Sequence, residues 1–76
     1  MQTLNEWFRD FHIGNYEMMV IEYPCFNLYI KAQENGTYVV MNNKHIIVDV
    51  VFEEMLKFFM NPVNTQYTGI SLWSHN

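Results

Sequence analysis

The sequence predicts an α+β fold: a short N-terminal helix, a three-stranded antiparallel sheet, and a second helix packed across that sheet. Two patterns carry this prediction. Apolar residues recur at helical spacing in residues 4–11 and 51–59, and alternating segments flank the pair Asn35-Gly36. A chain of 76 residues is expected to form a single domain, 1–76, with residues 64–76 as an irregular tail or an extra strand.

The first helix is predicted over about residues 4–11. Thr3 and Glu6 have the spacing of a capping box, in which each side chain accepts a hydrogen bond from the other residue's backbone amide. Gly14 is expected to end the helix in a left-handed conformation. The apolar residues of this segment share one helical face: Leu4, Trp7, Phe8 and Phe11.

Residues 16–23 are rich in strand-forming side chains, and Pro24 ends the segment. Glu17 and Glu22 would project from opposite faces of this strand, because successive side chains alternate. The segment therefore has no clean buried side. Either a bulge or an edge position would explain this, and the pattern does not choose between them.

A hairpin is predicted in residues 26–41, because Asn35-Gly36 suits the two central positions of a turn that needs positive φ at both. The cross-strand pairs for this two-residue loop are Glu34 with Thr37, Ala32 with Val39, and Ile30 with Met41. One face of the hairpin then carries Ile30, Ala32, Val39 and Met41. The other face carries Tyr29, Lys31, Gln33, Tyr38 and Val40.

A polar break at residues 42–44 precedes a β-branched run, residues 45–51, whose boundary with the second helix is ambiguous. Asp49 is expected to be the helix N-cap. With that start, Glu53 and Glu54 would lie near the positive end of the helix dipole, where carboxylates are stabilising.

The second helix is expected to end at Asn61-Pro62 and to be the main core element across the sheet. Its apolar residues cover most of the circumference: Val51, Phe52, Met55, Leu56, Phe58 and Phe59. Residues 65–73 form either a last strand or an irregular tail. Trp73 would then dock on the core or contact a partner.

Composition and charge restrict the function classes. Eight acidic residues against four basic ones give a net charge of −4, which disfavours direct binding of nucleic-acid phosphates. Cys25 is the only cysteine, so no internal disulfide is expected and the cytosol fits best. Charged residues near the N-terminus argue against a signal peptide, and Asp49 interrupts the most apolar stretch, so no membrane association is expected. The 17% of aromatic residues serve either the core or a contact surface.

The sequence contains no recognisable catalytic or metal-binding motif. A catalytic nucleophile needs an oriented base beside it. The candidate side chains are scattered: Cys25, Ser71, Ser74, His12, His45 and His75. A structural zinc site takes four closely spaced Cys or His ligands, which are absent, and the acidic balance argues against base stacking on Tyr29 and Tyr38. We therefore expect no enzyme activity, no metal and no cofactor.

Five stretches within residues 1–60 carry a family likeness: LNEWFRDF at 4–11, NY at 15–16, LYIK at 28–31, ENGTYVV at 34–40 and VFEEMLKFF at 51–59. In their order they resemble the small acidic anti-CRISPR proteins of prophages, which inhibit the RNA-guided DNA nuclease by occupying its PAM-reading surface. The sequence departs from that family in two places. Residues 42–45 are not an acidic run, and no Asp or Glu follows Pro62.

The resemblance implies partner-binding roles for six residues. They are Asn15 and Tyr16 after the first helix, and Glu34, Asn35, Gly36 and Thr37 at the hairpin tip. Their role would be to offer hydrogen-bond acceptors to the arginines that otherwise recognise guanines. A different nuclease surface, a different target or an unrelated origin stay open, because the two departures remove negative charge that DNA mimicry would use.

Taken together, these features favour a small phage or mobile-element protein that binds and inhibits a host protein in the host cytoplasm. A CRISPR effector nuclease is the target that the resemblance names. The alternative is a non-enzymatic structural or assembly protein that acts through self-association, with residues 16–23 or the tail as a sheet edge. An active enzyme is disfavoured, because no site constellation of the expected kind is present.

Overall fold

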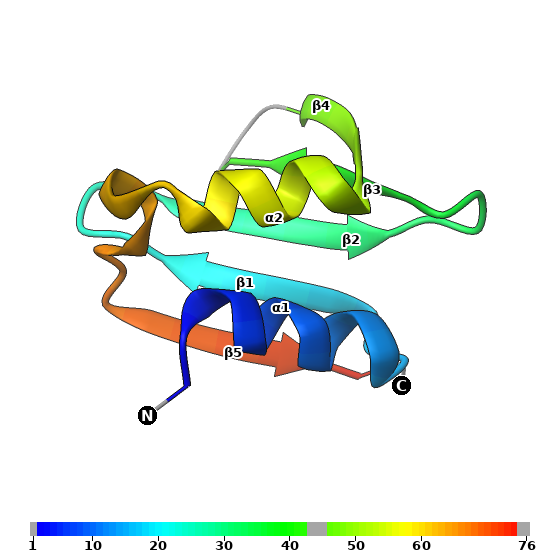
Figure 1. The fold of residues 1–76 in the computed structure, drawn as a ribbon, viewed down its shortest axis with the longest axis horizontal. Helices are drawn as coiled ribbons and strands as arrows, with labels where there is room; N and C mark the ends of the chain where they lie inside the picture. The colour runs from blue at the N-terminus through cyan, green and yellow to red at the C-terminus, as the bar shows by residue number, and fades with distance from the viewer. Residues whose placement is uncertain (1, 43–45, 75–76) are drawn as a thin grey trace.

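The computed structural model describes residues 2–42 and 46–74 of the chain. These residues form α1 (Leu4–Ile13), β1 (Met18–Glu22), β2 (Asn27–Ala32), β3 (Thr37–Met41), β4 (Ile46–Val51), α2 (Phe52–Met60), the 3₁₀ helix η1 (Pro62–Thr65) and β5 (Gly69–Trp73) (Figure 1). The strands make one antiparallel sheet in the order β4-β3-β2-β1-β5. The α+β class is therefore confirmed, although the sheet has five strands where the sequence predicted three.

Some residues named in the predictions from sequence lie outside the described part of the chain. Residues 43–45, which contain most of the expected polar break and His45, lie there, and so does His75. The tail, by contrast, is described as far as Ser74 and forms strand β5, which pairs with β1. Of the two expectations for residues 65–73, the strand is correct and the irregular tail is not.

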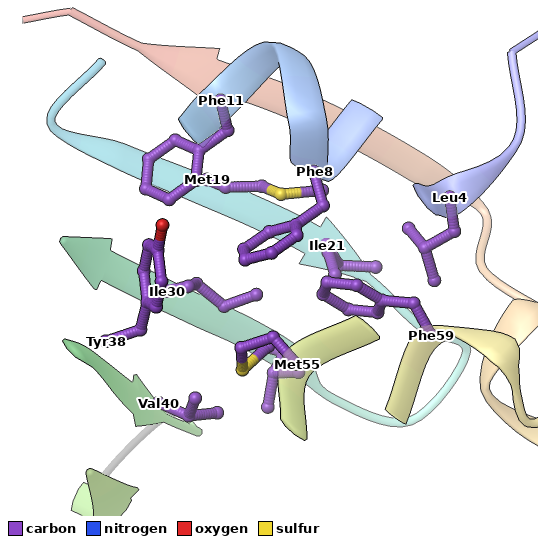
Figure 2. Close-up of a cluster of buried hydrophobic side chains, with 11 residues drawn as sticks. Leu4, Phe8, Phe11, Met19, Ile21, Ile30, Tyr38, Val40, Met55 and Phe59 are labelled. Carbon is purple, nitrogen blue, oxygen red and sulfur yellow. The ribbon is translucent and has the colours of Figure 1, made fainter. Parts of the chain in front are cut away.

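Both helices pack on one face of the sheet, where their apolar side chains meet alternate residues of the strands (Figure 2). The buried residues of α1 are Leu4, Phe8 and Phe11, and those of α2 are Met55 and Phe59. The sheet contributes Met19, Ile21, Leu28, Ile30, Tyr38 and Val40 to the same cluster. The two helices thus share the core, whereas the sequence predicted α2 as the main core element.

Phe8 lies at the centre of this core and is fully buried. Its ring centroid lies 5.2 Å from that of Tyr38, 5.3 Å from that of Phe52 and 5.0 Å from that of Phe59. Such edge-on and offset ring contacts add to the stabilisation from burial alone. Phe8 therefore connects α1 to both α2 and the sheet.

The start of α1 has the capping box that the sequence predicted. The Thr3 hydroxyl accepts a hydrogen bond from the Glu6 amide at 3.2 Å, and the Thr3 amide donates to the Glu6 carboxylate at 2.7 Å. The helix end differs from the prediction, because Asn15 has the left-handed conformation (φ 57°) and Gly14 does not (φ −88°). Gly14 is needed for a different reason: a β-carbon there would lie 2.6 Å from the Asp10 carbonyl oxygen.

The β2–β3 hairpin has a register that differs by one residue from the predicted one. Ile30 pairs with Val40 and Ala32 pairs with Tyr38. A one-residue shift moves every side chain of a strand to the opposite face. Consequently Tyr38 and Val40 are buried under the helices, and the face assignment predicted for the β3 side of the hairpin was wrong.

The hairpin loop explains this register. Gly36 has positive φ (87°) and Asn35 does not, so the connection is a three-residue loop instead of the predicted two-residue turn. The Gly36 amide donates to the Gln33 carbonyl at 3.2 Å, and the Gln33 amide donates to the Thr37 carbonyl at 2.9 Å. The Asn35 side chain accepts a hydrogen bond from the Thr37 amide at 3.1 Å, a local bond of the kind that competes with other turn geometries.

β1 lies inside the sheet, between β2 and β5, so the expected edge position is wrong. Its registers with β2 and β5 are both continuous, without the bulge that was the other explanation. Glu17 precedes the strand and Glu22 is its last residue, where its side chain is exposed. The two glutamates are therefore accommodated at the ends of the strand, and Met19, Val20 and Ile21 between them are buried.

The boundary between β4 and α2 lies later than predicted. Asp49 belongs to β4, where it is exposed and pairs with Val39, so it is not the helix N-cap. Val51 takes the N-cap position without a side-chain hydrogen bond. Strand pairing with β3 explains why the β-branched run stays extended up to this residue. The helix ends at Met60, before Asn61-Pro62, as predicted.

Candidate interaction surfaces

The six residues predicted to bind a partner lie at one end of the sheet. Asn15 and Tyr16 follow α1, and residues 34–37 form the tip of the β2–β3 hairpin (Figure 1). Because β1 and β2 are antiparallel, with Met18 opposite Lys31, the start of β1 and the end of β2 meet at this end. The two groups of predicted binding residues therefore lie at the same end of the sheet, although they belong to separate turns.

The hairpin tip is held by hydrogen bonds among its own residues. The Asn35 amide oxygen accepts from both the amide and the hydroxyl of Thr37, the latter at 2.7 Å. The Gln33 side chain donates to the Thr37 hydroxyl at 2.9 Å. The Asn35 oxygen is therefore already used within the loop. The exposed Glu34 carboxylate is the stronger acceptor that this tip can offer to a partner.

Asn15 and Tyr16 differ from each other in exposure. Asn15 is exposed and holds the left-handed turn between α1 and β1. Tyr16 is half-buried and packs against the hydrophobic core, with its ring beside Gly14. A substitution at Tyr16 would therefore disturb the fold as well as a contact, whereas Asn15 is accessible.

His12 and Tyr38 form a pair that the sequence did not predict. The His12 Nδ1 atom and the Tyr38 hydroxyl are hydrogen-bonded, and the His12 ring centroid lies 4.4 Å from that of Phe52. Burial raises the pKa of Tyr38, so its hydroxyl stays protonated at neutral pH. The pair therefore connects the end of α1 to β3 and does not supply a phenolate. The contact between His12 and Tyr38 depends on the observed hairpin register. The predicted register placed Tyr38 on the face opposite Ile30, away from the helices.

The face of the sheet opposite the helices mixes apolar and polar side chains. Val20 is buried there, while Trp73 is 56% exposed and donates a hydrogen bond from its indole to the Ser71 hydroxyl at 3.0 Å. Lys31 forms an ion pair with Glu17 at 3.9 Å. By strand alternation the other residues of this open face are Met18, Glu22, Asn27, Tyr29, Thr37, Val39, Met41, Asp49 and Val51.

The end of the molecule opposite the hairpin tip carries several exposed apolar side chains. Phe26, Met60 and Val63 are 45%, 68% and 67% exposed. Tyr23 stacks on Phe26 with ring centroids 5.0 Å apart and donates a hydrogen bond to the Asn64 carbonyl at 2.8 Å. Burial, with a smaller contribution from Tyr67, raises the pKa of Tyr23 to about 12. Residues 23–30 and 58–74 contain no Asp, Glu, Lys or Arg.

The nucleophiles and bases considered in the sequence analysis are spread over the molecule. His12 lies at the end of α1, Ser71 lies in β5 on the open face, and Cys25 is an exposed free thiol in the β1–β2 loop. Among residues 2–42 and 46–74, the structure contains no group of three or more His, Cys, Asp or Glu side chains that could hold a metal ion. No helix in the same ranges has the length and apolar character needed to span a bilayer.

These surfaces present three distinct kinds of contact. The hairpin tip offers a carboxylate, the outer strand β5 offers backbone groups, and the opposite end offers apolar side chains. Comparison of the chain with protein-family models, with curated proteins and with solved structures finds no match.

Proposed function

We propose that this protein is a small phage or mobile-element protein that binds and inhibits a host protein in the host cytoplasm. A CRISPR effector nuclease is the target that the sequence resemblance favours. The observation that supports the proposal most strongly is the hairpin tip, an exposed loop that carries a carboxylate and is ordered by its own hydrogen bonds. A binding inhibitor needs such a surface and needs no catalytic group.

The tip suits an arginine-bearing partner surface. Arginine and carboxylate form paired, charge-assisted hydrogen bonds, and the same guanidinium groups recognise the edge of guanine in DNA. Glu34 would supply the carboxylate, and the exposed Asn15 would add a neutral contact from the same end of the sheet. Because the tip is already ordered, little conformational entropy would be lost on binding.

The proposal is tested by the cleavage activity of purified RNA-guided nucleases on a PAM-containing duplex, titrated with the full chain. We expect the protein to inhibit at least one nuclease. We expect Glu34→Gln to weaken the inhibition by about tenfold, the loss of one charge-assisted hydrogen-bond pair. Glu54→Gln is the matched control, since Glu54 is an exposed acid on α2. Equal effects of the two substitutions, or no binding to any nuclease tested, would refute the assignment.

The second candidate is a structural or assembly protein that acts through self-association. Of the two segments expected to offer a sheet edge, residues 16–23 contain the interior strand β1, whereas the tail forms the outer strand β5. One of the two surfaces therefore supports this candidate. Sedimentation over a wide concentration range tests this candidate, because a molecular mass that stays constant would exclude self-association.

A further inference from the structure

Strand β5 forms one border of the sheet, so the backbone groups on its outer side have no strand partner in the described part of the chain. Such an edge pairs readily with another strand unless charges, proline or a bulge protect it. The sequence of β5, Gly69-Ile70-Ser71-Leu72-Trp73, has no charge and no proline, and its register with β1 is continuous. β5 therefore lacks the charges, the proline and the bulge that protect other edge strands from pairing.

The other border of the sheet, β4, is protected by a charge and by an irregular register. Asp49 is exposed in the middle of β4, and two copies of this strand would bring like charges together. The pairing of β4 with β3 is also irregular at Val40 and Met41. β5 has neither feature, so it is the border of the sheet at which another strand can pair.

We propose that two copies of this protein pair through β5, antiparallel and about a two-fold axis at Ser71. In this register Gly69 lies opposite Trp73 of the second copy, and Ile70 lies opposite Leu72 of the second copy. Ser71 lies opposite itself. The strand is thus complementary to its own reversed copy, as a two-fold symmetric interface requires.

The side chains fit this register on both faces of the sheet. Ile70 and Leu72 lie on the helix-covered side and are partly buried against the core, so the new pairs would extend an apolar surface. On the open side, Trp73 is 56% exposed, and in this register it would lie beside Gly69 of the second copy and lose part of that exposed apolar surface. Within each copy the Glu22 carboxylate lies against Gly69, where an added β-carbon would clash with it, so Glu22 borders the proposed contact.

Charge favours a second copy over a charged partner at this edge. Each copy has a net charge of −4, yet residues 58–74 contain no charged side chain, so no like charges from this segment meet across the axis. The remaining repulsion acts between distant groups and is screened by salt. A short pair of strands buries little surface, so we expect a weak, concentration-dependent dimer that tightens as salt is added.

The inference is tested by sedimentation equilibrium of the full chain from micromolar to millimolar concentration. We expect a monomer–dimer equilibrium in the wild-type protein. Ser71→Lys, which puts two ammonium groups at the axis, is expected to raise the dimer dissociation constant at least tenfold. Ser71→Thr, which keeps a neutral hydroxyl, should leave it within about twofold. Trp73→Ala tests the same contact at an exposed position and should also raise the dimer dissociation constant several-fold.

Val63→Lys is the control for the apolar end of the molecule, because Val63 is exposed and lies outside β5. It should leave the dimer unchanged. A wild-type monomer at every concentration would overturn the inference, and so would a dimer that resists Ser71→Lys and Trp73→Ala but is lost with Val63→Lys. This last result would still support self-association through another surface. Because β5 contains none of the hairpin-tip residues, the inhibition assay on Ser71→Lys tests the inhibitor proposal separately.

Discussion

The helix-covered face and the open face of the sheet are built from alternate residues of the same strands, but they differ in burial and charge. The covered face carries the buried apolar residues that contact both helices, and no charged residue is buried among those described. The open face combines Val20 with the ion pair of Lys31 and Glu17 and with the exposed Trp73. Stability is therefore expected to depend mainly on the covered face, and the exposed positions of the open face can change without loss of the fold.

The largest expected effect is on the covered face, where Phe8→Ala would leave a cavity between α1, α2 and the sheet. We expect the free energy of unfolding to fall by about 3–5 kcal/mol, the usual range for removing a fully buried Phe. Trp73→Ala, at an exposed position of the open face, should cost less than about 1 kcal/mol. Denaturant unfolding of both variants measures the difference, and similar losses would contradict the division between the faces.

A smaller effect is expected at Tyr23, whose side chain packs against the core and donates to the Asn64 carbonyl. The folded protein has a Tyr23 pKa of about 12, above the ordinary value of 10.0. The stabilisation from its protonated hydroxyl is therefore fully present below pH 10 and is lost as the pH rises through 12.

Tyr23→Phe removes this titration. We expect the variant to be less stable than the wild type by about 1 kcal/mol at pH 7, the contribution of one hydrogen bond, and this gap should narrow above pH 10. Urea unfolding of the two proteins at a series of pH values measures the gap. A gap that stays constant, or widens, as the pH rises would show that the hydroxyl does not contribute in this way.

Much of the fold was predictable from local patterns. The capping box at Thr3 and Glu6, the hairpin around Asn35-Gly36 and the end of α2 at Asn61-Pro62 are all present. Each of these features depends on residues that are close together in the sequence, so a local sequence pattern is enough to predict it. Residues 34–37 lie at the hairpin tip for the same reason, while their role in binding a partner stays a prediction.

The errors arise where distant residues decide the outcome. Asp49 has good N-cap chemistry, but pairing of β4 with β3 keeps it in a strand. The segment 16–23 looks like an edge because of Glu17 and Glu22, but β5 pairs with its outer side. Neither pairing is visible in a local pattern.

The register error has a more local origin. The Asn35 side chain bonds to Thr37, which stabilises a longer loop in which only Gly36 needs positive φ. Both loops suit an Asn-Gly pair, and they differ by one residue in the pairing of the strands. The choice between them decides which residues of β3 are buried, and it also creates the contact between His12 and Tyr38.

The register of β3 and the assignment of the two faces are best tested by comparing two identical substitutions at neighbouring positions, Val39→Ser and Val40→Ser. Val40 is buried on the covered face, and Val39 lies on the open face opposite Lys31. We expect Val40→Ser to lower the free energy of unfolding by about 2 kcal/mol more than Val39→Ser, because only Val40 loses fully buried apolar surface. Equal losses, or a greater loss for Val39→Ser, would contradict the register and the assignment of the two faces.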